Sequence, residues 1–324
     1  MNTHSQNIDT REAVVTDALN QKRLDYAMAE LFPDFSRSLH KQWILAGQVT
    51  VNGSVIKKPR QSVLVDQVIQ VQVVMETQTS WQPEPISLNI IYEDDDIIVI
   101  NKPAGLVTHP GAGNPQHTLV NAILHHCPAS DTLPRAGIIH RLDKDTSGLL
   151  VSAKTRESLF SLSNAMQARE IHRHYEAVVE GTLIAGNTID APIGRHTTQR
   201  TKMAVIHTGK PAVTHYRLIQ KFQHHTHVSV QLETGRTHQI RVHFKHIKHP
   251  LVGDRTYNPR RHIPGKIPPE LQTALHAFPR QALHARRLSL THPTTGEIMT
   301  WEAPLPDDFS RLIESLNTYA SSHE

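Results

Sequence analysis

Hydrophobic positions in the first quarter of the chain follow helical spacing and then strand spacing. Residues 24–31 carry leucine and methionine every three or four positions, which predicts a helix that ends before Pro33. A second helix is predicted from Leu39 to Gly47. Val49 and Val51 alternate with polar residues before Asn52-Gly53, a typical hairpin turn, and Ile69, Val71 and Val73 alternate with glutamines in a further predicted strand. Two short helices and a small sheet are therefore expected.

Strand and helix patterns interleave along the rest of the chain, which favours an α+β fold with a mainly antiparallel sheet. Strands are predicted at 88–92, 97–101, 149–153, 174–180, 214–220 and 228–232, and helices at 119–126, 158–167, 237–247 and 308–319. Residues 94–96, three aspartates, predict a hairpin turn, and residues 254–281, rich in proline and arginine, are expected to be irregular. The predicted organisation is a flexible tail at 1–18, a small domain at 19–75, a linker at 76–86 and a large domain at 87–324.

Composition narrows the class of protein. The 324 residues are enough for about two domains. The sequence has no apolar run long enough to cross a bilayer, and its first ten residues lack the apolar core of a secretory signal. The single cysteine, Cys127, rules out an internal disulfide and a multi-cysteine metal site. A soluble, cytoplasmic protein is expected.

Basic residues are concentrated in one segment. Residues 195–261 contain thirteen lysines and arginines against two acidic residues, together with ten histidines, whereas residues 1–80 contain eight of each sign. A local excess of this size favours a surface for a polyanion, above all a nucleic acid. The alternative is a solvated basic face.

Polar residues between two apolar runs mark a candidate catalytic loop at 140–148, HRLDKDTSG. Asp143 has Arg141 and Lys144 beside it, and these cations should keep its carboxylate ionised. At this stage Asp143 is either a catalytic group or a hydrogen-bonded residue that fixes a turn.

A basic helix is predicted after Glu233. Thr237 is a candidate N-cap, and Ile240, Phe244 and Ile247 would form the buried face. Arg241 would lie near the start of this helix, where it could orient a loop carboxylate. A helix that simply turns its basic residues to solvent fits the pattern equally well.

Tyr175 shares one face of a predicted strand with Ala177 and Val179. A tyrosine on an inward face is usually a core residue, and the functional alternative is a platform for a nucleic-acid base. A functional metal is not expected, because zinc-ligand spacing is missing, and nucleotide hydrolysis is not expected, because a phosphate-binding Gly-Lys-Ser/Thr loop is missing from the sequence. The histidines at 224, 225 and 227 could chelate a metal only weakly.

Several blocks of the sequence resemble the RluA-type family of pseudouridine synthases. The resemblance covers residues 23–305 and lies mainly in four stretches, which are HRLDKDTSG at 140–148, TGRTHQIRVH at 234–243, NKPAGLVTHPGAGN at 101–114 and RQALH at 280–284. Residues 23–73 are similar to the S4 (αL-type) RNA-binding domain that precedes the catalytic domain in some members. The resemblance therefore implies an S4 domain followed by a synthase domain with a central cleft.

The resemblance also implies roles for individual residues. Asp143 matches the essential aspartate, Tyr175 the tyrosine that packs on uracil, and Arg241 the basic partner of the aspartate. Arg141 matches the arginine that replaces the flipped nucleotide. His140, Arg236 and Leu283 are implied to assist base flipping or RNA binding, and RNA contacts of the S4 domain are implied for Arg23, Arg37, Lys41, Lys57 and Lys58.

The implied activity is the isomerisation of uridine to pseudouridine in 23S ribosomal RNA or in large-subunit precursor particles, with uridines of the helix 69 stem-loop as the expected targets. No cofactor, metal, DNA or membrane is implied, and a monomer is expected. Three alternatives stay open. They are a synthase for other ribosomal or transfer RNA uridines, a non-catalytic RNA-binding assembly factor, and a metal nuclease that uses Asp143 and Asp145.

Overall fold

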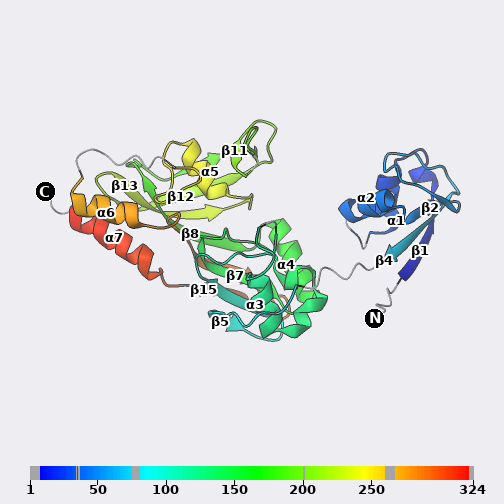
Figure 1. Cartoon of the computed structure of the whole chain (residues 1–324), viewed down its shortest axis with the longest axis horizontal. Helices are drawn as coiled ribbons and strands as arrows, with labels where there is room; N and C mark the ends of the chain where they lie inside the picture. The colour runs from blue at the N-terminus through cyan, green and yellow to red at the C-terminus, as the bar shows by residue number, and fades with distance from the viewer. Residues whose placement is uncertain are drawn as a thin grey trace. The chain divides into compact units, whose positions relative to one another are not determined.

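The computed structural model divides the chain into two compact units, Met1–Ser80 and Trp81–Glu324 (Figure 1). It describes residues 8–320 except for 34, 36, 75–80, 112, 200 and 260–266. The two units are called the small unit and the large unit below. In the described ranges, no helix combines the length and the apolarity that crossing a membrane requires.

The small unit contains two helices packed on a four-stranded sheet with the order β1-β4-β2-β3. Both predicted helices and the predicted hairpin are present. Its elements are β1 (Ile8–Val14), the short 3-10 helix η1 (Asp17–Leu19), α1 (Leu24–Leu31), α2 (Arg37–Ala46), β2 (Val49–Val51), β3 (Ser54–Val55) and β4 (Val68–Val74).

The prediction of a flexible tail over residues 1–18 is wrong for the part that the structure describes. Residues 8–14 form β1, which pairs with β4 along its whole length. The hydrophobic pattern misses this strand because β1 is an edge strand of mostly polar sequence, and Val14 at its end is half exposed. Residues 1–7 lie outside the described ranges.

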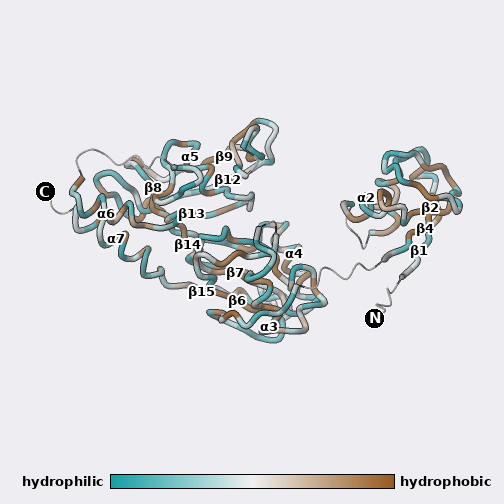
Figure 2. Tube along the Cα trace, viewed as in Figure 1, coloured by the Kyte–Doolittle hydropathy of each residue, from teal (hydrophilic) through white to brown (hydrophobic). Residues whose placement is uncertain are grey.

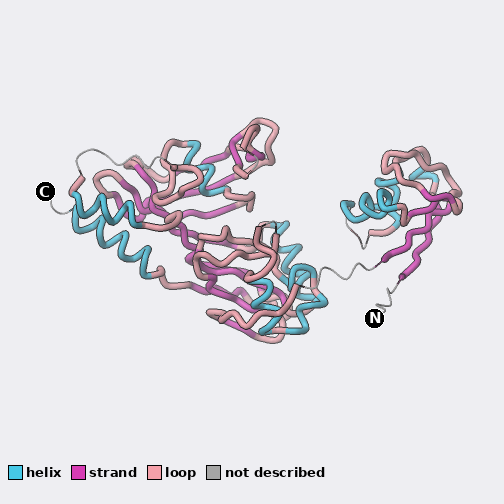
Figure 3. The backbone as a smooth tube through the Cα atoms, viewed as in Figure 1, coloured by secondary structure: helices cyan, strands magenta, loops and turns pink. Residues whose placement is uncertain are grey.

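A nine-stranded sheet forms the framework of the large unit, with the order β5-β6-β7-β14-β8-β13-β12-β9 and with β15 beside β14 (Figure 3). All strand pairs described in it are antiparallel except β7 with β14. The predicted α+β class and mainly antiparallel sheet are confirmed. The strands are β5 (Ile90–Glu93), β6 (Ile97–Lys102), β7 (Ser147–Ala153), β8 (His172–Glu180), β9 (Asn187–Asp190), β12 (Val213–Lys221), β13 (His225–Leu232), β14 (Leu283–Thr291) and β15 (Ile298–Glu302).

Helices cover both faces of the sheet at its β6–β7 part. β6 is buried on both sides, and its apolar run is brown in Figure 2. One face packs against α3 and the other against α4. The helices of the large unit are η2 (Pro128–Thr132), η3 (Pro134–Gly137), α3 (Leu119–His126), α4 (Arg156–Ala168), α5 (Gln239–His246), α6 (Pro269–Ala277) and α7 (Asp307–Ala320), and a separate hairpin is formed by β10 (Ile193–Arg195) and β11 (Met203–Val205).

Two boundaries need correction. The predicted linker at 76–86 ends too late, because Trp81 packs on the core of the large unit and the Glu84 backbone N–H donates to Asn121 O. The segment 254–281 is not wholly irregular, since it contains α6, whose Leu271 and Leu275 are buried. Residues 260–266 of this segment and 75–80 of the linker lie outside the described ranges.

Candidate active site

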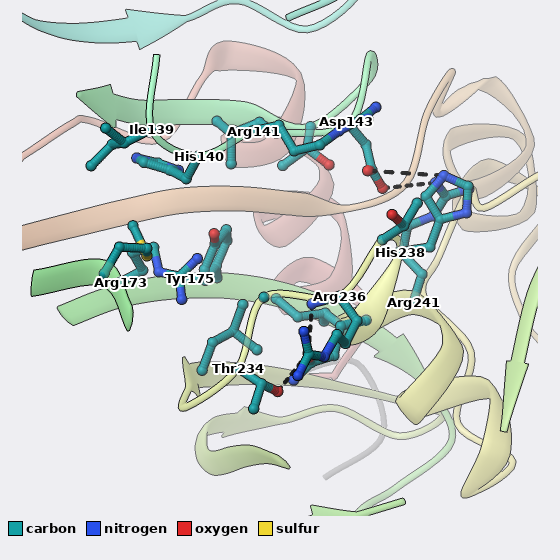
Figure 4. Close-up of a pocket in the computed structure, with 18 of the residues that line it drawn as sticks. Ile139, His140, Arg141, Asp143, Arg173, Tyr175, Thr234, Arg236, His238 and Arg241 are labelled. Carbon is teal, nitrogen blue, oxygen red and sulfur yellow. Dashed lines mark hydrogen bonds and ion pairs between the residues drawn. The ribbon is translucent and has the colours of Figure 1, made fainter. Parts of the chain in front are cut away.

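A cleft of about 630 Å³ opens in the large unit and brings together four segments that are distant in sequence. They are the 138–146 loop, the end of α4, the start of β8 and the 232–241 segment, and His109, Arg135 and Leu283 complete the lining (Figure 4). Its lining has two acidic residues, Asp143 and Glu233, and six arginines, Arg135, Arg141, Arg169, Arg173, Arg236 and Arg241. Such a balance suits a polyanionic ligand.

Side chains and backbone groups of the 101–114 segment hold the loop that carries Asp143. Lys102 is fully buried, and its Nζ donates to the carbonyl oxygen of Lys144 at 3.0 Å and to two further carbonyls of its own segment. The Gly105 N–H donates to the same Lys144 oxygen, and Thr108 Oγ1 donates to Leu142 O at 2.7 Å. These contacts fix the 140–148 loop to the 101–114 segment.

The 280–284 segment supports the other side of the same loop. Arg280 Nη1 donates to Asp145 O at 3.2 Å, and Gln281 Nε2 donates to Thr146 Oγ1 at 3.1 Å. Gly148 has a φ of +113°, and a Cβ at this position would lie 2.3 Å from Ala285 O. Glycine is therefore required where β7 approaches β14.

Arg241 links Asp143 to a second carboxylate. Its Nη1 lies 2.9 Å from Asp143 Oδ2, while its Nε and Nη2 donate to Asp254 at 2.7 and 2.9 Å. Burial by itself would lower the pKa of Arg241. Hydrogen bonds and electrostatic attraction to Asp254, and to a lesser extent to Asp143, outweigh burial and raise this pKa. A solvent-facing role is ruled out, because Arg241 is only 6% exposed. The guanidinium is thereby fixed, and it fixes Asp143 in turn.

His238 and Tyr257 complete the surroundings of Asp143. His238 Nε2 lies 3.9 Å from Asp143 Oδ1, and His238 Nδ1 is 2.7 Å from the Tyr257 hydroxyl. Burial is the main cause that lowers the pKa of His238. The helix α5 starts at Gln239 with His238 as its N-cap at φ +57°, so the prediction of Thr237 as the N-cap is wrong.

Asp254 and Tyr257 were not identified from the sequence, because they fall in the segment that was expected to be irregular. Asp254 is 1% exposed and also accepts hydrogen bonds from the backbone N–H groups of Thr256 and Tyr257. One signal was available. Asp254 is one of two acidic residues in the basic segment 195–261, where an isolated carboxylate is best explained as a partner for a buried arginine.

The predicted stacking residues lie on the wall formed by β8 and β14. Tyr175 is 5% exposed, lines the cleft, and lies in the same apolar cluster as Leu283. Burial raises the pKa of the Tyr175 phenol. The ring thus offers a neutral, largely apolar surface to a flat ligand. Figure 4 shows Tyr175 on the wall opposite the loop that carries Arg141 and Asp143.

The remaining predicted cleft residues differ in exposure. Arg141 lines the cleft and is exposed. Arg236 is half buried and donates from Nε to Pro211 O at 3.1 Å. His140 is 9% exposed, and its Nε2 accepts a hydrogen bond of 3.3 Å from the Val151 N–H, so its contacts lie within the protein. Burial, and to a lesser extent Arg173, lowers the pKa of His140 to about 3.

All five basic residues predicted for the S4 domain lie on the surface of the small unit. One of them, Arg23, pairs with Asp25 through two hydrogen bonds. Arg37 stacks over the Tyr26 ring, with 5.4 Å between its Cζ and the ring centroid. The exposed set is Arg23, Arg37, Lys41, Lys57 and Lys58.

Within the described ranges, no three histidine, cysteine or acidic side chains are grouped as a metal site would need. Asp143 is the carboxylate of the cleft that Arg241 holds. Its Oδ2 is held by Arg241, while Oδ1 accepts no hydrogen bond from the part of the chain that the structure describes. A carboxylate with one anchored and one available oxygen can act as a base or as a nucleophile.

Comparisons with known proteins agree with this arrangement. The model of the RNA pseudouridylate synthase family matches residues 96–246, and the S4 domain model matches residues 22–69. The chain is 51% identical over 319 residues to ribosomal large subunit pseudouridine synthase D of Vibrio vulnificus, covering 98% of each chain. It is 50% identical over 320 residues to the protein of the same name from Escherichia coli K12, covering 99% of this chain and 98% of that one.

A solved structure agrees with these matches. The human RNA pseudouridylate synthase domain containing 4 protein superposes with a TM-score of 0.56 at 25% identity, over 71% of this chain and 93% of that one. Sequence likeness over nearly the whole chain is the stronger observation. The chain belongs to the RluA-type family of RNA pseudouridylate synthases, as a member with an S4 domain ahead of the synthase domain.

Proposed function

We propose that this enzyme isomerises uridines to pseudouridine in 23S ribosomal RNA, that its targets lie in the helix 69 stem-loop, and that it acts in the cytoplasm on large-subunit RNA or precursor particles. The observation that carries the proposal is the anchored carboxylate of Asp143 in an arginine-lined cleft. The names of the relatives from Vibrio vulnificus and Escherichia coli support the large ribosomal subunit as the source of substrate.

The reaction exchanges one bond to the ribose for another. The N1–C1′ bond breaks, the uracil turns, the C5–C1′ bond forms, and the proton on C5 is lost while N1 gains one. The proposed role of Asp143 is to remove a proton or to attack the sugar or base through Oδ1, the oxygen that Arg241 leaves available. Tyr175 and Leu283 provide the apolar wall on which the detached uracil turns.

A uridine inside a folded RNA must be extruded before its glycosidic bond can be reached, which costs a few kcal/mol. Arg141 is the exposed guanidinium beside Asp143, and its proposed role is to stack in the gap that the uridine leaves. Arg236, at the rim of the cleft, is proposed to contact the RNA backbone. The proposed contribution of His140 is to hold the loop through Val151 rather than to touch RNA.

The test is to map pseudouridines in ribosomal and transfer RNA from cells with and without the gene, and from deleted cells that express either the wild type or Asp143→Asn. We expect the deleted cells to lack pseudouridine in helix 69. Expression of the wild type should restore it, and expression of Asp143→Asn should not. Loss at other ribosomal or transfer RNA uridines would replace the proposed target. Unchanged modification together with a large-subunit assembly defect, restored equally by Asp143→Asn, would show an assembly factor instead.

A further inference from the structure

Arg173 is a buried cation in the cleft that has no counter-charge. It lies on β8, is only 8% exposed, and lines the cleft two residues before Tyr175. No hydrogen bond or ion pair of its guanidinium is found within the described residues, and its Nε is sealed from solvent without a partner. The other two buried arginines that the structure describes in the large unit are paired through their guanidinium groups, Arg241 with Asp143 and Asp254, and Arg280 with Asp308.

An unpaired buried charge is unfavourable to the folded state. Water is lost from a group that would otherwise be strongly solvated, and no carboxylate in the described part of the chain compensates for it. Groups with this arrangement are concentrated at functional sites, where a ligand supplies the missing partner. Arginine is also the side chain best suited to bind phosphate through two parallel hydrogen bonds.

The chain leaves space for the Arg173 guanidinium. Gly235 lies beside it, and a Cβ at this position would come within 2.9 Å of Arg173 Nη1. Gly235 does not have a positive φ, so the glycine serves the close approach rather than a turn. Arg173 also shares a strand face with Tyr175, at a spacing of about 7 Å along β8.

We propose that Arg173 binds a phosphodiester that flanks the target uridine, and so fixes the extruded nucleotide on the Tyr175 wall. The proposal rests on the proposed function, in which Tyr175 packs on the uracil. The phosphates of a nucleotide lie one sugar away from its base, which matches the step along β8 from Tyr175 to Arg173. Figure 4 shows Arg173 at the end of the cleft remote from Asp143, so the two residues hold different parts of one nucleotide.

The first measurement needs no RNA. Arg173→Met keeps most of the volume and removes the charge, and its melting temperature should be higher than that of the wild type by about 2–4 °C. Arg169→Met is the matched control at the rim of the same cleft, because Arg169 is 57% exposed and pairs with Glu233. This control should change the melting temperature by less than about 1 °C. A large decrease for Arg173→Met would show a structural role and overturn the proposal.

The second measurement is RNA affinity against salt concentration for the full chain. Arg173→Met should bind target RNA about tenfold to a hundredfold more weakly, and the slope of log affinity against log salt should become shallower by about 0.7–0.9. Arg173→Lys should retain the slope and lose part of the affinity. Weaker binding with an unchanged slope would place a neutral base edge at Arg173 and would overturn the phosphate assignment.

The third measurement changes the charge of the RNA and does not use Arg173→Met. Two target RNAs are prepared, each with a single uncharged methylphosphonate on one side of the uridine. Their affinities for the wild type and for Arg173→Lys are compared with those of the unmodified RNA. One of the two positions should weaken wild-type binding about tenfold and should remove most of the difference between the two proteins. Equal binding of all RNAs would overturn the proposal. None of these readouts depends on turnover, so failure of the proposed modification activity would be detected separately.

Discussion

The two units carry basic side chains in opposite ways. In the small unit Arg37, Lys41, Lys57 and Lys58 are all exposed. In the cleft of the large unit the side chain of Arg241 is 8% exposed and is held by carboxylates on both sides. An exposed lysine side chain can adopt many rotamers and so contact phosphates at different positions. A buried guanidinium that is paired on both sides is held in a single orientation.

This difference indicates that charge serves two purposes in one enzyme. On the small unit we expect it to contribute RNA affinity that is nearly independent of geometry and decreases steeply with salt. At Arg241 it contributes position, because the charge of this guanidinium is compensated within the protein by Asp143 and Asp254. Substitution of Asp143 or Arg241 should therefore change mainly turnover, and substitutions on the small unit should change binding to extended RNA.

The largest effect is expected from Asp143→Asn. The amide keeps the size of the side chain and removes its charge, so turnover should decrease by roughly a thousandfold or more, while RNA affinity changes by less than about tenfold. Asp145→Asn, at the next carboxylate of the same loop, is the control and should keep most of the activity. Pseudouridine formation by purified Asp143→Asn with substantial turnover would contradict the assignment.

The second largest effect is expected from Arg241→Met. Asp254 would then be a buried carboxylate without its guanidinium partner, so unfolding free energy should decrease by about 3–5 kcal/mol. Turnover of the folded fraction should decrease by about a hundredfold with much less loss of RNA affinity, because Asp143 is no longer oriented. Asp254→Leu combined with Arg241→Met should recover stability without recovering turnover. Equal losses of turnover and affinity in Arg241→Met would identify Arg241 as a phosphate contact.

The fold was predictable where the hydrophobic period is strong. The 119–126 helix and the 97–101 strand agree with the structure to within one residue, because nearly every residue in them is buried. β14 was missed although it pairs with three neighbours. Its alternation is interrupted by Arg286-Arg287, where the register with β8 shifts, and its pairing with β7 is set by residues far away in sequence.

The site was predictable only in part, because its residues are brought together by contacts between distant segments rather than by a local pattern. The loop around Asp143 is visible because polar residues interrupt two apolar runs. The Asp143–Arg241 pair spans 98 residues, and only the sheet topology brings the two together. Asp254 and the unpaired state of Arg173 depend on burial and partners, which a local pattern does not contain.

A smaller effect is expected in the pH dependence of stability. The pKa of His140 is about 3 in the folded state, below its ordinary value of about 6.5, mainly because of burial. Between these values the unfolded chain binds the additional proton, so this contribution to stability is lost as the pH falls below about 6.5. His140→Gln should reduce the slope of unfolding free energy against pH by up to about 1.4 kcal/mol per unit between pH 6 and 4.

Chemical unfolding of wild type and His140→Gln at a series of pH values measures this slope. His172→Gln, at an exposed position on β8, is the control. Identical slopes for wild type and His140→Gln would mean that His140 is not held neutral by burial. Arg173→Met should leave most of the effect in place, because the charge of Arg173 is the smaller of the two causes.

The smallest effect is expected from the small unit. Its exposed cations can add a second contact only on an RNA that reaches both units, and a linked contact raises effective concentration only in that case. The triple substitution Lys41, Lys57 and Lys58→Gln in the full chain, and in parallel deletion of residues 1–80, should decrease kcat/KM on assembled large-subunit RNA by about tenfold. An isolated stem-loop that fills only the cleft should be modified at nearly the wild-type rate. If kcat/KM decreased by the same factor on both substrates, the small unit would not serve targeting. The exposed charges of the small unit would then not differ in purpose from the buried charge of Arg241.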